Sequence, residues 1–236
     1  MKVYKYRGSD DEKIFKRDLK SLFDNFFWAS DLSNLNDPFE TITDTKRIKN
    51  RLNWIAKKIG VNTEADFQLL DDNTDEVLSL DHAMGIYSLS KTPVDELLWA
   101  HYANSHKGFC IEYDLDVLLS TDRKNILHSF PVKYSKKPPG FSWCEIFRNE
   151  PNSMIEKFAF YKSKRWEYEQ EHRIVSSIAG KISYNCKALK SIYFGLRIGE
   201  TEKNDIINLL KERGIDFYQI QLEKNSYSLK AVKLEV

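Results

Sequence analysis

Apolar and polar residues alternate in several short stretches of the chain. Each such stretch predicts a β-strand, because successive side chains of a strand point to opposite faces. Strands are predicted at KVYKYR (2–7), FFWAS (26–30), GIYSLS (85–90), GFCIEYD (108–114), EHRIVSS (171–177), KSIYFG (190–195), DFYQIQLE (216–223) and SLKAVKLEV (228–236). We expect the last two to pair with each other. ILHSFPVKYS (126–135) is also strand-like, but Pro131 interrupts it and predicts a bent or edge element.

Other stretches place apolar residues three and four positions apart, which is the spacing of one face of an α-helix. Helices are predicted at DDEKIFKRDLKSLFDN (10–25), KRIKNRLNWIAKKIG (46–60), EADFQLL (64–70), DEVLSLD (75–81), TPVDELLWAHYAN (92–104), NSMIEKFAFYKSKRW (152–166) and ETEKNDIINLLKERG (200–214). We expect Thr92 to cap its helix and Pro93 to occupy the first helical position. This order of elements predicts an α+β fold with a mixed or antiparallel sheet flanked by helices.

Length, composition and charge limit the possible classes of protein but do not identify a function. We expect a single domain over residues 1–236, with an exposed loop at 135–143. The formal net charge of +1 argues against a strongly electrostatic nucleic-acid binder. The three cysteines lack CxxC spacing, which predicts reduced thiols and neither a disulfide framework nor a zinc site. The chain starts without a signal-peptide pattern and has no apolar run of about 20 residues, so a cytoplasmic protein is expected.

The stretch WEYEQEH (166–172) places Glu167, Glu169 and Glu171 at alternate positions before an apolar strand. In an extended chain the three carboxylates would crowd one face, which is unfavourable without a compensating cation. One interpretation is a solvated loop in which Lys164, Arg165 and Arg173 are the partners. The other is a site that stabilises a cation, such as the oxocarbenium-like transition state of glycosidic cleavage. Glu171, next to the apolar strand, is expected to be more buried than Glu169.

Polar and aromatic residues also gather at two other places. Ser88, Ser90, His101, Tyr102 and His106 occur within one predicted strand–helix–loop unit, and this density favours a site there. Taken singly, Trp99 and Tyr102 are more often core residues than a ligand platform. At the first strand, Tyr6 and Arg7 precede Gly8, which permits close approach of a ligand. An edge strand with one solvated face explains that segment equally well.

Two resemblances follow from the order of these segments. YKYR, LNDPFE, LLWAHYANSHKGFCIEYD, WEYEQEHRIV and IYFG, from about residue 4 to 195, resemble the bacterial domain of unknown function 2971 family, whose name implies no reaction. YRG (6–8), GIYS (85–88), Tyr102 and EHRIV (171–175) resemble, in order, the motifs of H-Y-E-type ADP-ribosyltransferases. That second resemblance implies a split sheet.

The second resemblance also implies residue roles. Arg7 would contact the adenosine half of NAD, Tyr102 would stack at the nicotinamide, and Glu171 would be catalytic. Glu169 would activate the acceptor, and Ser88 and Ser90 would line the pocket. The sequence departs from the family at the first strand, where Tyr6 replaces the expected histidine, so either Tyr6 or Arg7 contacts the ligand. The position of the stacking tyrosine also differs, so that Trp99 or His101 are alternatives to Tyr102.

The resemblance further implies that NAD is a substrate and that no metal is needed. Lys164, Arg165 and Arg173 would hold the pyrophosphate or neutralise the acids. The implied role is that of a toxin or phage-defence effector. The acceptor would be a protein, a nucleic acid or a small molecule. An antitoxin or other partner protein is expected, and no membrane contact.

Two further hypotheses stay open. The first is a metal-dependent nuclease or phosphohydrolase, with Asp37, Glu40 or Glu112 joining Glu169 and Glu171 around magnesium and Lys164 near the phosphate. The second is a non-catalytic module that binds protein or single-stranded nucleic acid through Trp99 and Tyr102.

Overall fold

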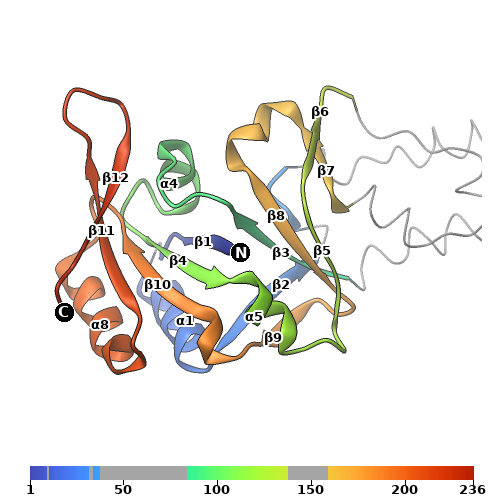
Figure 1. Cartoon of the computed structure of the whole chain (residues 1–236), viewed down its shortest axis with the longest axis horizontal. Helices are drawn as coiled ribbons and strands as arrows, with labels where there is room; N and C mark the ends of the chain where they lie inside the picture. The colour runs from blue at the N-terminus through green and yellow to red at the C-terminus, as the bar shows by residue number, and fades with distance from the viewer. Residues whose placement is uncertain (10, 32–33, 38–83, 138–158) are drawn as a thin grey trace, which may run out of the picture.

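The chain is described by a computed structural model, which covers residues 1–9, 11–31, 34–37, 84–137 and 159–236 (Figure 1). Ten of the described strands form one sheet, in the order β12-β11-β10-β4-β1-β3-β2-β9, with β8 and β5 joined beside β3. These strands are β1 (Lys2–Arg7), β2 (Phe26–Asp31), β3 (Gly85–Ser90), β4 (Phe109–Asp114), β5 (Ile126–Pro131), β8 (Glu171–Ser176), β9 (Gly180–Ser183), β10 (Leu189–Phe194), β11 (Asp216–Leu222) and β12 (Leu229–Lys233).

Most neighbouring strands run antiparallel. The pair β10 and β11 is parallel because the helix α8 (Glu200–Leu210) crosses between them. A separate two-stranded parallel pair consists of β6 (Lys133–Ser135) and β7 (Tyr161–Ser163). These observations confirm the predicted α+β class with a mostly antiparallel sheet.

Helices cover the sheet from both sides (Figure 1). The helix α1 (Glu12–Phe23) begins at Asp11, whose side chain accepts a hydrogen bond from the backbone N–H of Ile14. It packs through Phe15 and Leu22, together with α8, against one face of the sheet. The helix α4 (Glu96–Tyr102) packs through Leu98 and Trp99 on the opposite face. The helix α5 (Leu115–Ser120) follows β4 directly.

The sheet is split along one edge of β3. Over its whole length, β3 pairs with β8, so β1 and β2 must share its other edge. On that edge β1 meets β3 at Ser90, and β2 meets it at Gly85 and Ile86. The backbone of Ser88 lies between these two contacts. The split therefore creates an opening into which side chains of three strands can project.

The structure corrects several predicted elements. Residues 161–163 form the strand β7, and residues 164–166 start a 3-10 helix, η3 (Lys164–Glu169), in place of the predicted α-helix. The helix at 92–104 starts later than predicted: Asp95, not Thr92, accepts the capping hydrogen bond, from the N–H of Leu98. Both α5 and β9 were missed. The predicted helices at 46–60, 64–70 and 75–81 lie outside the described residues, as does most of the predicted loop at 135–143.

The remaining predicted strands and helices are confirmed, with most ends within one or two residues of the predicted ones. The exceptions are α8, which ends four residues before the predicted end at 214, and β12 (Leu229–Lys233), which ends three residues before the predicted end at 236. The chain bends at Pro131 as expected, with β5 ending there and β6 starting two residues later. Among the described helices, none combines the length and the apolar character needed to cross a membrane.

Candidate functional site

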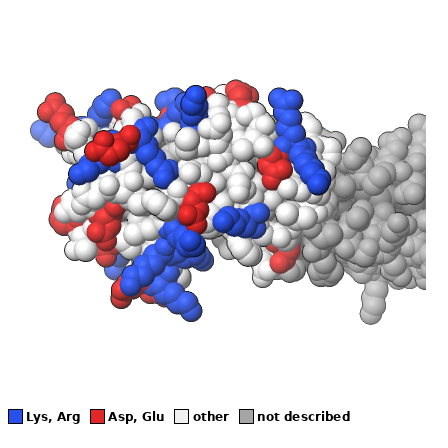
Figure 2. All heavy atoms as spheres, turned by 90° about the horizontal axis from the view of Figure 1, so that it is seen from below, with Lys and Arg blue, Asp and Glu red and all other residues white. Residues whose placement is uncertain are grey.

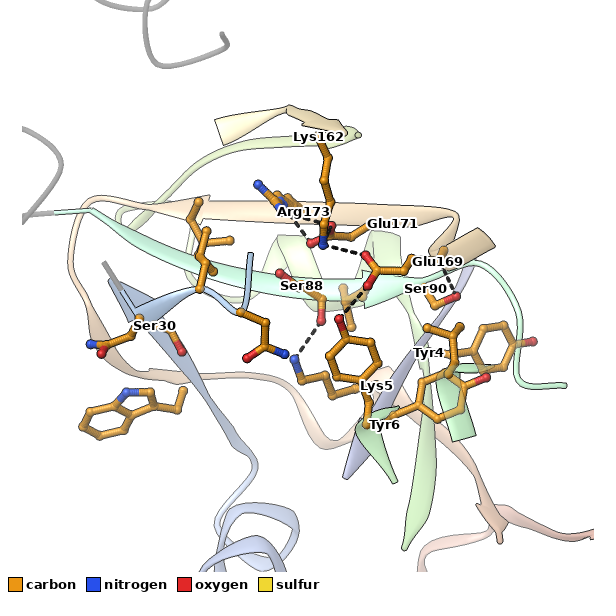
Figure 3. Close-up of a pocket in the computed structure, with 18 residues that line it drawn as sticks. Tyr4, Lys5, Tyr6, Ser30, Ser88, Ser90, Lys162, Glu169, Glu171 and Arg173 are labelled. Atoms are coloured by element: carbon orange, nitrogen blue, oxygen red, sulfur yellow. Dashed lines mark hydrogen bonds and ion pairs between the residues drawn. The ribbon is translucent and has the colours of Figure 1, made fainter. Parts of the chain in front are cut away.

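A cavity of about 180 Å³ lies at the split in the sheet (Figure 3). Its walls come from β1, β2, β3 and α4 on one side and from the β7–β8 segment on the other. This volume is below the 300–1,000 Å³ typical of pockets that enclose a whole small-molecule ligand. It accommodates one ring or one sugar-phosphate unit, so a larger ligand would extend past its mouth.

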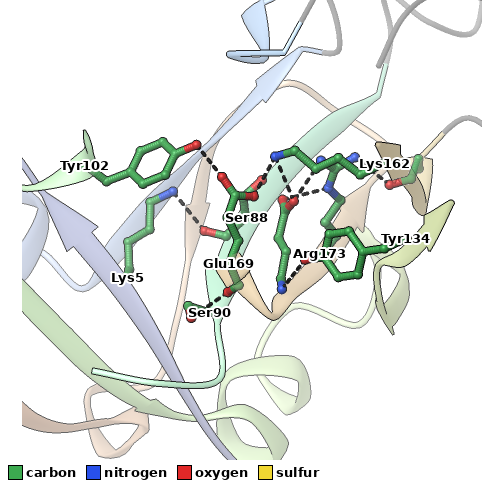
Figure 4. A network of polar contacts seen from close by, with 10 residues as sticks. Lys5, Ser88, Ser90, Tyr102, Tyr134, Lys162, Glu169 and Arg173 are labelled. Carbon is green, nitrogen blue, oxygen red and sulfur yellow. Dashed lines mark hydrogen bonds and ion pairs between the residues drawn. The ribbon is translucent and has the colours of Figure 1, made fainter. Parts of the chain in front are cut away.

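Glu171 is the first residue of β8 and is held in place from three directions (Figure 3). Figure 4 shows the surrounding polar network, with Arg173, Lys162 and Tyr134. The carboxylate of Glu171 accepts two hydrogen bonds from Arg173, from Nε at 2.7 Å and from Nη2 at 3.0 Å. Lys162 Nζ lies 3.3 Å from Oε2 of Glu171. The backbone N–H of Glu171 donates a hydrogen bond to the hydroxyl of Tyr134 at 2.7 Å. This bidentate pairing fixes the orientation of the carboxylate.

Glu169 ends η3, and its carboxylate faces the same cavity. The Tyr102 hydroxyl donates to its Oε1 at 2.5 Å, and Lys162 Nζ donates to its Oε2 at 2.6 Å. Its backbone carbonyl accepts a hydrogen bond from the hydroxyl of Ser90 at 2.8 Å. Lys162 therefore bridges the two glutamates, and α4 reaches them through Tyr102.

The backbone between the two glutamates explains how they meet. Gln170 adopts a left-handed conformation, with φ 45° and ψ 47°, which ends η3 and turns the chain into β8. Because residues 164–169 are helical and not extended, the three carboxylates do not share one strand face. Glu167 points to solvent and pairs with Lys164 at 3.7 Å. The exposed fractions of Glu169 and Glu171 are nearly equal, 4% and 5%, so solvent exposure does not separate the two acids.

The surroundings shift the pKa values of the two acids in opposite directions. Burial raises the pKa of Glu169, and this effect exceeds the opposing influence of Lys162 and Tyr102. Burial also acts to raise the pKa of Glu171, but the Arg173 and Lys162 cations outweigh it and hold that pKa at about 2. Neighbouring carboxyl groups whose pKa values are driven apart in this way are suited to different roles in catalysis.

Ser88 and Ser90 line the cavity as predicted from the sequence. Their places follow from the strand register, in which Ser88 is paired with Arg173 and Ser90 with Glu171 across β3 and β8. The side chains of paired residues point to the same face of a sheet. The hydroxyl groups therefore lie beside the charged residues, and the hydroxyl of Ser88 also helps to lower the pKa of Glu171.

Of the remaining predicted residues, Tyr6, Tyr102 and Arg173 line the cavity, and three do not. Arg7 points to the α1 side of β1, where its Nη1 lies 3.9 Å from Asp18 Oδ1. Trp99 is fully buried, donates to the carbonyl of Pro93 and packs edge-on against Tyr6. His101 is exposed on α4.

The predicted cationic partners are only partly confirmed. Arg173 pairs with Glu171, whereas Lys164 and Arg165 are exposed on η3 and do not line the cavity. Lys162, the partner that the two acids share, was missed because a helix was predicted through it. An isolated lysine in a polar stretch gives no signal of its own, so only its place on β7 reveals it.

Two more cavity residues escaped the sequence reasoning. Lys5 lies on β1 in the split, and its Nζ donates to the backbone carbonyl of Ser88 at 2.9 Å (Figure 3). Trp28 lies on β2 and keeps 59% of its surface exposed although it lines the cavity. The alternation of β2, with Phe27 and Ala29 buried on the other side, places Trp28 on the cavity face. FFWAS was predicted as a strand, but its first four residues are all apolar, so the sequence did not show which face was the functional one.

The residues of the metal hypothesis do not converge. Glu112 is buried in β4, where it bonds to Tyr193 and Lys2, and it does not line the cavity. Asp37 is buried as well and lies outside the cavity lining, and Glu40 falls outside the described residues. Within the described ranges, no three His, Cys, Asp or Glu side chains come together as metal ligands would.

Charge on the surface is mixed. On the face shown in Figure 2, basic and acidic side chains are interspersed and do not form a single basic field. This agrees with the formal net charge of +1.

Comparison with known proteins identifies a family for part of the chain. Residues 98–174 match the family model described as "Protein of unknown function (DUF2971)". This confirms the resemblance to the domain of unknown function 2971 family over the segment from α4 to β8, which contains Tyr102, Glu169 and Glu171. No curated protein and no solved structure matches the chain. The resemblance to ADP-ribosyltransferases stays a prediction.

Proposed function

We propose that the cavity binds the nicotinamide–ribose part of NAD and cleaves the bond between them, as an NAD-dependent ADP-ribosyltransferase or NAD glycohydrolase. The observation that carries the proposal is the pair Glu169 and Glu171. The two acids face one cavity beside Tyr102, and their pKa values are displaced in opposite directions. Such a pair supplies one permanent anion and one group able to accept a proton.

In this proposal Glu171 stabilises the positive charge that develops on the ribose as the glycosidic bond breaks. An ionised carboxylate has about four lone-pair positions, and Arg173 and Lys162 occupy three of them. The Ser88 hydroxyl also interacts with this carboxylate, so the substrate would compete with it for the remaining position. The low pKa of Glu171 keeps the carboxylate ionised throughout the neutral range.

Glu169 accepts the proton of the attacking group, which is water in a glycohydrolase or the acceptor in a transferase. Its raised pKa brings it closer to the pH at which a general base works best. Tyr102 and Lys162 hold its two oxygens in place. Tyr102 also offers its ring to the nicotinamide, and Trp28 offers an exposed ring at the mouth of the cavity.

In this proposal the carboxylates stabilise the positive nicotinamide–ribose by close contact and not by long-range attraction. Glu169 and Glu171 are balanced by Lys162 and Arg173, so this group of four has no net charge. A positive nicotinamide is therefore not drawn in by a field of one sign. Its stabilisation must come from carboxylate oxygens at close range, where the low dielectric of a closed site strengthens each interaction.

The test is incubation of the protein with NAD labelled in the ADP-ribose part, followed by measurement of released nicotinamide and of the fate of the label. Glu171→Gln is expected to lower nicotinamide release at least about 100-fold, because it removes the charge that stabilises the transition state. Glu167→Gln is the matched control, since Glu167 belongs to the same acidic stretch but is exposed. It is expected to keep full activity.

Glu171→Gln also removes the charge of one partner of the buried Arg173, so some loss of stability is expected. Thermal unfolding of each variant separates a folded inactive protein from an unfolded one. Nicotinamide release by folded Glu171→Gln at the wild-type rate would contradict the proposal. So would a wild-type protein that releases no nicotinamide.

A further inference from the structure

Lys5 is a cation of the cavity that has no acidic partner of its own. Its Nζ donates to the Ser88 carbonyl and lies 4.8 Å from the centre of the Tyr87 ring. It forms no ion pair with a carboxylate in the described part of the chain. Glu169 and Glu171 are already paired with Lys162 and Arg173. When all these groups are ionised, the positive charge of Lys5 is therefore uncompensated.

The split in the sheet explains this position. Ser88 lies on β3 between the contacts with β1 and β2, so its carbonyl on that edge has no strand partner. Lys5 reaches across the opening and satisfies this carbonyl. One of its three donors is used in this way, and the ammonium group has two others to offer a ligand.

The charged and titratable groups around Lys5 do not cancel its charge. The pKa of Lys5 is lowered to about 7, mainly by burial and then by the charge of Arg7 on β1. Glu171 on β8, Asp18 on α1 and Cys110 on β4 act in the opposite direction without forming an ion pair. A partly desolvated ammonium of this kind gains most from an anion that enters the cavity.

We propose that Lys5 is an anion subsite of the cavity, which takes a phosphate or diphosphate group and takes up a proton as it binds. The ligand class is a sugar phosphate or nucleoside diphosphate, whose charged group contacts Lys5 while the sugar extends toward Glu169 and Glu171. This assigns to Lys5 the anion-binding role that the sequence suggested for Lys164 and Arg165. It rests on the proposed function only for the choice of an ADP-ribose probe.

The sign of the proton linkage follows from the charges. An anion favours the charged form of lysine, so the pKa of Lys5 must be higher in the complex than in the free protein. Affinity for the anion is greatest below pH 7 and falls as the pH rises through the pKa of the free lysine. At about pH 8, where much of the free lysine is neutral, binding is expected to take up as much as about one proton.

The experiment is calorimetric titration of ADP-ribose into the wild-type protein from about pH 6 to about pH 9, in buffers of different ionisation enthalpy. The diphosphate of ADP-ribose does not titrate in this range, so any proton taken up belongs to the protein. Adenosine is the uncharged probe. Lys5→Met keeps the length of the side chain without its charge, whereas Lys5→Arg keeps a charge at every pH tested. Lys190→Met, at an exposed position of β10, is the control.

For the wild type we expect proton uptake near pH 8. We also expect affinity for ADP-ribose to fall about tenfold per pH unit once the free lysine is mostly neutral. Lys5→Met should weaken ADP-ribose binding about 10- to 100-fold at pH 6 and leave adenosine binding unchanged. Lys5→Arg should bind ADP-ribose with little dependence on pH, and Lys190→Met should match the wild type.

Three results would overturn the inference. The first is wild-type binding of ADP-ribose without proton uptake. The second is a folded Lys5→Met protein that binds ADP-ribose as tightly as the wild type. The third is an equal loss of ADP-ribose and adenosine binding in Lys5→Met, which would show that Lys5 only braces the Ser88 carbonyl. None of these requires NAD cleavage, so a failure of the proposed function, seen as absent nicotinamide release, is distinguishable from a failure of the subsite.

Discussion

Two buried glutamates in this protein have nearly the same partners in different surroundings. Glu169 accepts hydrogen bonds from Tyr102 and Lys162, at 2.5 and 2.6 Å. Glu112 accepts hydrogen bonds from Tyr193 at 2.6 Å and from Lys2, whose Nζ lies 2.9 Å from its Oε1. Partner chemistry alone therefore does not mark a functional site.

The difference lies in what surrounds each group. Glu169 faces a cavity and has a second acid nearby, and the lysine that binds it is buried. Glu112 lies outside the cavity lining, and its lysine is mostly exposed on β1. A glutamate with its hydrogen bonds satisfied and no access to ligand contributes to packing and strand pairing. The same residue at a cavity, next to a second acid, can take part in chemistry.

The largest expected effect is on the rate of nicotinamide release, and it distinguishes Glu169 from Glu112. Glu169→Gln should reduce nicotinamide release about 100- to 1,000-fold, because an amide cannot accept the proton of the attacking group. Glu112→Gln should leave the rate within about twofold and lower the thermal stability. In the wild type, activity should fall as the pH drops through the raised pKa of Glu169, since a base must be ionised. The rates and melting temperatures of both variants are measured in parallel. A folded Glu112→Gln protein as inactive as Glu169→Gln would contradict the distinction between the two residues.

The second effect concerns stability. Lys162→Met removes the only charge shared by two buried carboxylates in the described site, and this should cost about 3–5 kcal/mol of unfolding free energy. Lys2→Met should cost less than about 1 kcal/mol, because Lys2 is mostly exposed to solvent. Denaturant unfolding curves measure both values. Equal losses would mean that burial of the lysine does not distinguish the two networks.

The smallest effect concerns the tyrosines. Tyr102→Phe deletes the hydroxyl bound to Glu169 but keeps the ring, so a decrease in activity of about 10-fold is expected. The variant should also raise the pH of the acid limb of the activity profile, because that hydrogen bond lowers the pKa of Glu169. Tyr193→Phe should leave the pH profile unchanged. An unaltered limb in Tyr102→Phe would show that the hydroxyl only fills space.

Much of the fold was accessible from the sequence because strands and amphipathic helices leave clear periodic patterns. β1, β3, β4 and β8 each show a run typical of strands, and α1 shows an apolar stripe. The short elements were harder to predict. β7 and β9 contain three and four residues, too few to show a period, and their formation depends on the strands they pair with.

The site was predicted only where its residues are marked by local sequence patterns. Glu169, Glu171 and Tyr102 stood out through local spacing, and the structure brings them together. Lys5 and Lys162 come from distant parts of the chain, and only the split in the sheet and the β6–β7 pairing place them at the cavity. Arg7 and Trp99 illustrate the reverse, because both looked suited to a ligand but are used in the protein interior.

The left-handed residue between the two acids has one more consequence. Because Gln170 alone separates them, its two backbone angles set the distance between their Cα atoms and so help to bring their side chains to one cavity. Glycine or asparagine at this position would adopt those angles readily, whereas valine or isoleucine would resist them. Relatives with a β-branched residue here would have to route the chain differently, and their acids would no longer meet. The identity of this one residue is thus a simple criterion for judging which relatives share the paired arrangement.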